Sequence, residues 1–120
     1  MIRVLVVDDQ QLLRQGLCSL LALSDKVEVV GQANDGAEAR DWLQANADGV
    51  DVMLLDIRMP RMTGIELLNS LKQDGALLPT IMLTTFDDHE SLMGALSAGA
   101  KGYLLKDVSL ETLVDGIEAV

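Results

Sequence analysis

The sequence predicts a single α/β domain in which helices cover both faces of a parallel β-sheet. Short apolar runs alternate along the chain with longer segments of helical period, and this alternation requires crossover connections between parallel strands. The apolar runs are continuous, as in strands that are buried on both faces. At 120 residues the chain is long enough for one hydrophobic core and too short for two.

Five strands are expected where short runs rich in Val, Ile and Leu are bounded by polar residues or Gly. They cover residues 2–7, 27–33, 51–55, 80–84 and 102–105. The predicted fold is a doubly wound, flavodoxin-like (βα)5 domain. Its strand order, 2-1-3-4-5, is expected by analogy with known sheets of this class, because the residues themselves do not fix which strands are neighbours.

Five helices are expected between and after these strands. The first has leucines at the spacing of one helix face, namely Leu13, Leu17, Leu20 and Leu21. The last has Ser109 as its expected N-cap and repeats that spacing at Leu110, Leu113, Val114 and Ile117. The other three are placed near 36–46, 64–73 and 88–98.

Composition excludes several classes of protein. Nine basic and nineteen acidic residues give a net charge of −10, which argues against direct nucleic-acid binding by this segment and suits a cation or a basic partner. The one cysteine, Cys18, cannot form an internal disulfide and fits a reducing compartment. The N-terminus lacks a signal peptide, and no apolar run approaches membrane-spanning length. A cytoplasmic location without membrane contact is expected.

Polar side chains follow four of the predicted strands at the point where each strand ends. Asp8 and Asp9 follow the first, Asp56 follows the third, Thr84 ends the fourth and Lys106 follows the fifth. In open α/β sheets, ligands bind beyond the carboxyl ends of the strands. The expected order makes these strands neighbours, so the five side chains should converge at one edge of the sheet.

This combination of side chains favours one chemistry. Three adjacent carboxylates need a counter-charge, and a hard cation such as Mg²⁺ accepts oxygen ligands while keeping positions open for water and phosphate. An ionised Asp can attack phosphorus to give an aspartyl phosphate. A metal ion and a fixed lysine would offset the charge of the phosphoryl oxygens. The residues therefore predict phosphoryl transfer onto Asp56.

Each of these residues has a simpler interpretation when it is taken alone. Asp8 could cap the first helix, Lys106 could be a surface lysine, and Thr84 could be an ordinary strand residue. Their joint placement, with Asp9 beside Asp8 and Asp56 on the neighbouring strand, favours the functional interpretation.

Four segments resemble the receiver domain of two-component response regulators, and the resemblance covers essentially the whole chain. They are the acidic pair Asp8-Asp9, DIRMPRMTG (56–64), LTT (83–85) and AGAKGYLLK (98–106). The resemblance implies that Asp56 is the phosphoacceptor. It also implies Mg²⁺ binding, with Mn²⁺ as a substitute, by Asp8, Asp9, Asp56 and the backbone carbonyl of Arg58.

The same resemblance assigns roles to four further positions. Lys106 would pair with the phosphoryl oxygens, and Thr84 would be the switch hydroxyl that moves to them. Tyr103 would be the aromatic residue whose ring then swings inward. Gly64 would relieve crowding at the start of the third helix.

The resemblance also implies partners. The phosphodonor would be a sensor histidine kinase. Phosphorylation would then cause the helix 4–strand 5–helix 5 face, or helices 1 and 5, either to form a homodimer or to release a DNA-binding domain. The segments LLKD and LTTFDD are similar to the LuxR/NarL/FixJ subfamily. Residues 1–120 are therefore expected to be the receiver domain of a longer transcription factor, which contacts DNA only through a C-terminal helix-turn-helix domain.

Two other functions remain open at this point. One is a pseudo-receiver, an interaction module that is never phosphorylated. The other is an aspartyl-phosphate phosphatase, but the familiar haloacid-dehalogenase type carries a second Asp two residues past its nucleophile, where this chain has Arg58. A signalling module, rather than a turnover enzyme, is expected.

Overall fold

The fold is a five-stranded parallel sheet flanked by helices, seen in a computed structural model that describes residues 1–46, 48–57, 59–84, 89–106 and 108–120. Its strands are β1 (Ile2–Val7), β2 (Val27–Ala33), β3 (Val52–Asp56), β4 (Thr80–Thr84) and β5 (Gly102–Leu105). Its helices are α1 (Gln11–Leu21), α2 (Gly36–Ala45), α3 (Gly64–Gln73), α4 (His89–Ser97) and α5 (Leu110–Ala119). The strand order is β2-β1-β3-β4-β5. The predicted fold class and order are confirmed.

The largest difference in strand boundaries concerns β3. The sequence predicts this strand over 51–55, whereas the ladder with β4 continues to Asp56, which pairs with Leu83. Asp56 is therefore the last residue of a buried strand and not the first residue beyond it. A backbone fixed by the sheet holds this carboxylate in place.

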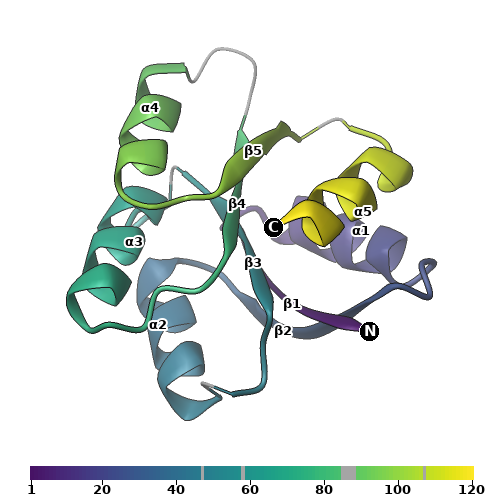
Figure 1. Ribbon diagram of the computed structural model, residues 1–120, viewed down its shortest axis with the longest axis horizontal. Coiled ribbons are helices and arrows are strands. Elements are labelled where there is room, and N and C mark those ends of the chain that lie inside the picture. Colours follow the sequence, from purple (N-terminus) through teal and green to yellow (C-terminus); the bar gives the residue numbers. More distant parts are fainter. Residues whose placement is uncertain (47, 58, 85–88, 107) are drawn as a thin grey trace.

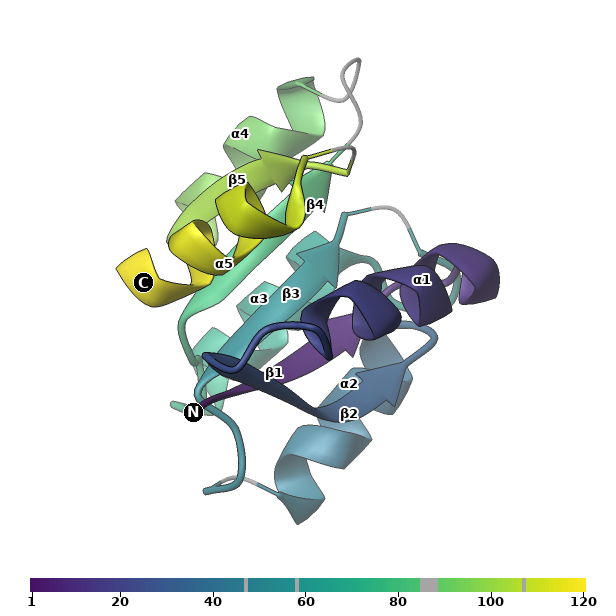
Figure 2. The ribbon, with the colours of Figure 1, turned by 90° about the vertical axis from the view of Figure 1, so that its right-hand side faces the viewer.

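Helices α1 and α5 cover one face of the sheet, and α2, α3 and α4 cover the other (Figures 1 and 2). Two hydrophobic clusters fill the spaces between these layers. Alternate residues of β1 serve them in turn, since Leu5 and Val7 belong to the α2–α4 side and Val4 and Val6 to the α1–α5 side. Burial on both faces explains why this strand is continuously apolar.

The predicted apolar face of α1 is only partly buried. Leu21 is inaccessible to solvent, but Leu13 and Leu20 remain 37% and 45% exposed. These two leucines line a groove between α1 and α5 instead of packing on the sheet. The helical periodicity of the leucines placed α1 correctly. It did not show how much of the leucine face is buried, because that depends on the distance between α1 and α5.

The predicted arrangement of α5 is confirmed. Leu113, Val114 and Ile117 are buried against the sheet. The Ser109 side chain accepts a hydrogen bond from the Thr112 N–H at 3.2 Å and so caps the helix.

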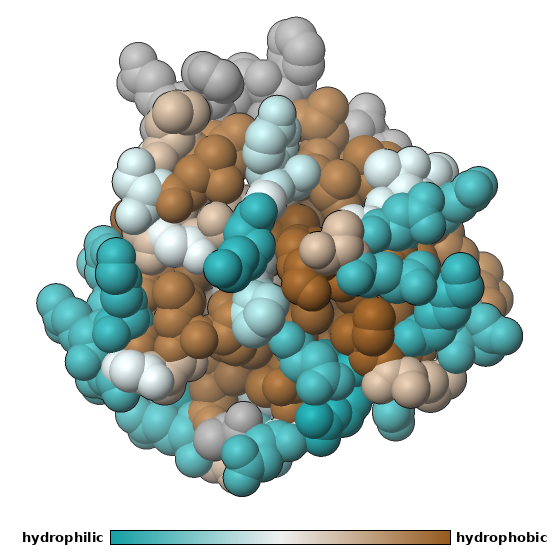
Figure 3. Space-filling view, in the orientation of Figure 1, coloured by the Kyte–Doolittle hydropathy of each residue, from teal (hydrophilic) through white to brown (hydrophobic). Residues whose placement is uncertain are grey.

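Strand β5 forms one edge of the sheet, and none of its four residues is fully buried. In Figure 3, apolar side chains reach the surface on both sides of a few hydrophilic side chains near the centre, and further hydrophilic side chains gather at the left, the bottom and the right. In the described residues, no helix is long and apolar enough to cross a membrane.

Gly64 lets α3 begin directly against the end of β3. Its N–H donates to the Ile57 carbonyl at 2.9 Å, and a Cβ at this position would lie 2.4 Å from the carbonyl oxygen of Asp56. No carbon atom fits at that distance. The expectation that this glycine relieves crowding is confirmed, and the crowded atom belongs to Asp56 itself.

We predict that Gly64→Ala lowers the free energy of unfolding by about 1–3 kcal/mol, because the clash must be relieved by moving backbone. Gly16→Ala is the matched control, since a Cβ on Gly16 of α1 has no atom within 4 Å. This second change should stabilise the protein by about 0.5–1 kcal/mol through helix propensity. Urea unfolding measures both, and equal effects of the two changes would contradict the assignment.

Candidate functional site

Three carboxylates converge at the carboxyl edge of the sheet. β1 and β3 are neighbours in a register that pairs Val7 with Leu55, which places Asp8 beside Asp56. Oxygen atoms of Asp8, Asp9 and Asp56 all lie within 4.8 Å of one another. Asp8 and Asp56 are buried, whereas Asp9 is exposed. The cluster is therefore rigid on the side of the sheet and open toward solvent.

The two carboxylate oxygens of Asp8 have different surroundings. Oδ1 accepts a hydrogen bond from the Gln10 N–H at 2.9 Å, so part of the simpler capping interpretation holds. Oδ2 is buried without a hydrogen-bond partner among the described residues. Such an oxygen is costly unless something satisfies it. A hard cation held between the three carboxylates would do so, and their oxygen chemistry fits Mg²⁺.

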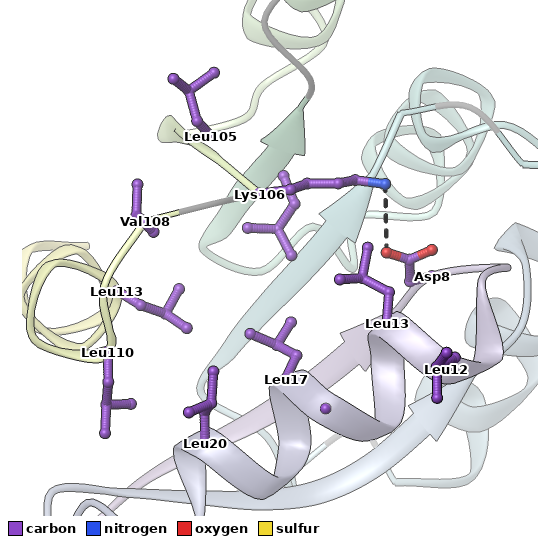
Figure 4. Close-up of a pocket in the computed structure, with 12 residues that line it drawn as sticks. Asp8, Leu12, Leu13, Leu17, Leu20, Leu105, Lys106, Val108, Leu110 and Leu113 are labelled. Atoms are coloured by element: carbon purple, nitrogen blue, oxygen red, sulfur yellow. Dashed lines mark ion pairs between the residues drawn. The ribbon is translucent and has the colours of Figure 1, made fainter.

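Among the residues that the structure describes, Lys106 is the one whose positive charge lies against both buried carboxylates. Its Nζ lies 3.2 Å from Asp56 Oδ1 and 3.5 Å from Asp8 Oδ2, and it donates to Gln10 Oε1 at 3.3 Å. At 3.5 Å, Lys106 and Asp8 form an ion pair, but their atoms are too far apart for a strong hydrogen bond. Figure 4 shows the lysine side chain reaching toward Asp8. The Lys106 N–H donates to the Thr84 carbonyl at 3.0 Å, which anchors the lysine backbone.

The environment of Asp56 disfavours its charge. Burial is the main cause, and the negative charges of Asp8 and Asp9 add to it. The Lys106 ammonium opposes these effects only in part, so the pKa of Asp56 is raised to about 6. At pH 7 the carboxylate is mostly ionised, in a place where an additional cation would stabilise it.

Two of the remaining predicted site residues lie on β4 and β5, and the third is outside the described residues. Thr84 is buried at the end of β4, the strand next to β3. Tyr103 lies on the edge strand β5 with 52% of its surface exposed. Arg58, whose backbone carbonyl is the further expected metal ligand, lies outside the described residues.

The segment between β3 and α3 is fastened to the start of α2, a feature that the sequence analysis missed. Arg61 has a left-handed backbone (φ 64°), which is uncommon for a residue other than Gly. Its guanidinium forms an ion pair with the buried Asp35, and the Gly36 N–H donates to the Met62 carbonyl at 3.1 Å. Asp35 was recognisable as a polar residue before a helix, but its partner is 26 residues away.

Comparison with known proteins gives consistent results. Residues 4–118 match the response regulator receiver domain family. The nitrate/nitrite response regulator protein NarP of Escherichia coli (strain K12) is 44% identical over 117 residues, which are 98% of this chain and 54% of NarP. The transcriptional regulatory protein DesR of Bacillus subtilis (strain 168) is 42% identical over 120 residues, 100% of this chain and 58% of DesR. The chain spans about half the length of these curated relatives.

A solved structure extends the similarity to three dimensions. The signal receiver domain of the response regulator NarL from Mycobacterium tuberculosis has a TM-score of 0.89 and 36% sequence identity. The match covers 98% of this chain and 94% of that domain. Receiver domains from LuxR-family regulators are also among the similar structures.

We predict that Asp56→Asn stabilises the metal-free protein at pH 7.5 by about 1–3 kcal/mol. The pKa of Asp56 is raised from 3.8 to about 6, so the folded state binds the proton more tightly. The contribution of this residue to stability is greatest below about pH 4 and declines as the pH rises through about 6. The asparagine variant lacks that decline.

Urea unfolding of both proteins between pH 4 and 8, with a chelator present, measures this difference. Added Mg²⁺ should stabilise the wild-type protein more than the variant, by about 1.4 kcal/mol at ten times its dissociation constant. A variant that is less stable than the wild type at pH 7.5 without metal would contradict the assigned repulsion.

Proposed function

Because the chain belongs to the response regulator receiver domain family, we propose that it accepts a phosphoryl group on Asp56 from a sensor histidine kinase. The observation that carries the proposal is the cluster of Asp8, Asp9 and Asp56 at one edge of the sheet, with Lys106 paired to Asp8 and Asp56. A purely structural role would not need three carboxylates and a lysine at one place, and a purely metal-binding role would not need the lysine. The acid cluster and the lysine together suit a transferring phosphoryl group.

The proposed reaction forms one bond and breaks one. A carboxylate oxygen of Asp56 attacks the phosphorus of a phosphohistidine, and the P–N bond breaks with its electron pair passing to the imidazole nitrogen. Asp56 is ready for this attack at neutral pH, because a pKa of about 6 leaves it mostly ionised. Rigid attachment to β3 keeps the nucleophile in position.

The other residues of the site stabilise charge. Asp8 and Asp9, with Asp56, would hold Mg²⁺ or Mn²⁺, which supplies positive charge to the phosphoryl oxygens when it is bound. Lys106 loses an ionic partner once Asp56 is phosphorylated. Its ammonium, now 3.2 Å from Asp56 Oδ1, is close enough to pair with a phosphoryl oxygen instead.

We propose that Thr84 and Tyr103 transmit the change. Thr84 ends the strand beside the phosphoacceptor strand, so its hydroxyl is suited to move toward a phosphoryl group on Asp56. Tyr103 has 52% of its surface exposed on the edge strand β5. Movement of Thr84 would leave space into which the Tyr103 ring can turn, which would repack the surface around β5.

The proposed output is transcription. The matched relatives include proteins named as transcriptional regulators that are about twice as long as this chain. We therefore propose that the complete protein carries a C-terminal helix-turn-helix domain, and that DNA is bound by that domain. A net charge of −10 makes direct DNA contact by the receiver domain unfavourable.

We predict that incubation with acetyl phosphate and Mg²⁺ adds one phosphoryl group to the protein, as measured by intact mass. The adduct should be absent in Asp56→Asn and strongly reduced when Mg²⁺ is chelated, because the transferring charge then lacks its counter-ion. No adduct, together with no binding of beryllium fluoride, would support the pseudo-receiver instead. Steady turnover of a generic phosphoester would support the phosphatase.

We propose that a phosphorylation-induced homodimer uses α1 and α5, the second of the two faces considered from the sequence. A groove of about 540 Å³ separates these helices, and Lys106 and Asp8 of the phosphoryl site stand at one end of it (Figure 4). It is lined mainly by apolar side chains, with Leu12, Leu13, Leu17 and Leu20 on the α1 side and Leu105, Val108, Leu110 and Leu113 on the α5 side. The groove shares Asp8 with the acid cluster, so a change at the cluster can act on it directly.

We predict that Leu20→Glu abolishes dimerisation of the beryllium-fluoride complex, because a charge in an apolar interface must be desolvated without a partner. Leu23→Glu is the matched control, since Leu23 is 76% exposed and does not line the groove in the described structure. Analytical ultracentrifugation with and without beryllium fluoride measures the effect. A dimer that survives Leu20→Glu would direct attention to the α4–β5–α5 face.

A further inference from the structure

Arg14 is a charged residue in a buried position of α1. It is spaced along the helix with Leu17, Cys18 and Leu21 at i, i+3, i+4 and i+7, so it lies on the face that turns toward the sheet. Only 7% of its surface is exposed. Arginine is almost never buried to this extent unless its charge or its donors have a specific purpose.

The guanidinium of Arg14 has three neutral acceptors. Nη1 donates to the backbone carbonyl of Asp8 at 2.7 Å and also to the Asn34 side-chain oxygen. Nε donates to Gln32 Oε1 at 3.1 Å. Among the described residues, Arg14 has no ion pair with a carboxylate. The fork of donors thus joins the turn after β1 to the end of β2 and the residue that follows it.

One polar atom of Asp8, Oδ2, takes no part in these hydrogen bonds and faces the Lys106 ammonium in an ion pair at 3.5 Å. Its N–H donates to the Ala33 carbonyl at 3.1 Å, and its carbonyl accepts from Arg14. Its Oδ1 accepts from the Gln10 N–H. The remaining atom, Oδ2, is buried, has no hydrogen bond in the described structure, and belongs to the acid cluster. Because hydrogen bonds hold the N–H, the carbonyl oxygen and Oδ1 of Asp8, the position of Oδ2 is fixed as well.

We propose that Arg14 is a positioning residue for the cation site, one that orients Asp8 and the following Asp9 through the Asp8 carbonyl. The proposal rests on the proposed function, since it concerns the same site. Arg14 contacts the Asp8 carbonyl and not Oδ2, the oxygen that faces Lys106 and the proposed cation site. It can therefore fix the geometry of the site without competing with a bound cation.

The charge of Arg14 and its geometry act in opposite directions on a cation. A nearby positive charge repels Mg²⁺, so removing the charge would strengthen binding, whereas losing the fork would weaken it by loosening the turn. Arg14→Lys separates the two effects. Lysine keeps the charge, but its single ammonium cannot reproduce the planar fork that reaches three acceptors.

Arg3→Lys is the matched control. Arg3 lies in β1. Its guanidinium also makes several hydrogen bonds, donating to both carboxylate oxygens of Asp51 and to the Asp48 carbonyl. It lies at the amino end of β1, opposite the acid cluster. The same substitution there loses similar hydrogen bonds without touching the turn that carries Asp8.

The test is calorimetric titration of Mg²⁺ alone into the wild-type protein and both variants, beside amide hydrogen exchange at Gln10 in the metal-free state. We expect Arg14→Lys to raise the Mg²⁺ dissociation constant about tenfold and to speed exchange of the Gln10 N–H, which is bonded to Asp8 Oδ1. Arg3→Lys should leave both quantities within about twofold of wild type.

An unchanged dissociation constant in Arg14→Lys, or an equal rise in Arg3→Lys, would overturn the inference and leave the proposed function intact. Failure of the wild-type protein to bind Mg²⁺ would instead overturn the proposed metal site itself. If Arg14→Lys does not fold, Asn34→Ala is tested instead. Asn34 is exposed, and this substitution removes one of the two acceptors of Arg14 Nη1. A rise of about two- to fivefold supports the inference, and no change overturns it.

Discussion

The mutual repulsion of two buried carboxylates is the interaction on which this structure depends. Asp8 and Asp56 lie at adjacent strand ends, away from water, with Lys106 as their shared cation. Burial is the main cause of the raised pKa of Asp56, the negative charge of Asp8 adds to it, and the single ammonium opposes these effects only in part. The residues of this edge therefore leave the negative charge only partly balanced. In the proposed function, a divalent cation and a phosphoryl group would together change that balance, which would make the edge of the sheet responsive to phosphorylation.

The fold contributes stiffness where the chemistry needs it. β1 and β3 are central strands covered on both faces, so the backbone under Asp8 and Asp56 has little freedom. The segments that follow these strands are fastened by side chains, with Arg14 holding the turn after β1 and Arg61 holding the segment before α3. These contacts reach residues of β2 and α2. Helix α2, although distant from the phosphoacceptor in the chain, thus supports the loops around it.

The same site borders two surfaces that can report its state. β5 leads directly into Lys106 and carries the exposed ring of Tyr103 at the sheet edge. The α1–α5 groove begins at Lys106 and Asp8 and continues along leucines that remain partly exposed. A shift of Lys106 toward a phosphoryl oxygen would act on both surfaces, because the lysine directly follows β5 and lines the end of the groove. Its backbone is also joined to β4 through the Thr84 carbonyl.

The fold class, the bounds of four of the five strands and the residues of the acid cluster could be predicted from the sequence. Those predictions depended on local patterns: runs of apolar residues, helical spacing, and carboxylates placed at strand ends. Only the tertiary structure decided that Asp56 ends β3, because the pairing with Leu83 that extends the strand comes from another segment. It also decided that the leucine stripe of α1 faces a groove, and that Arg14 and Arg61 hold the loops. These features arise from contacts between residues far apart in the chain, which no local pattern encodes.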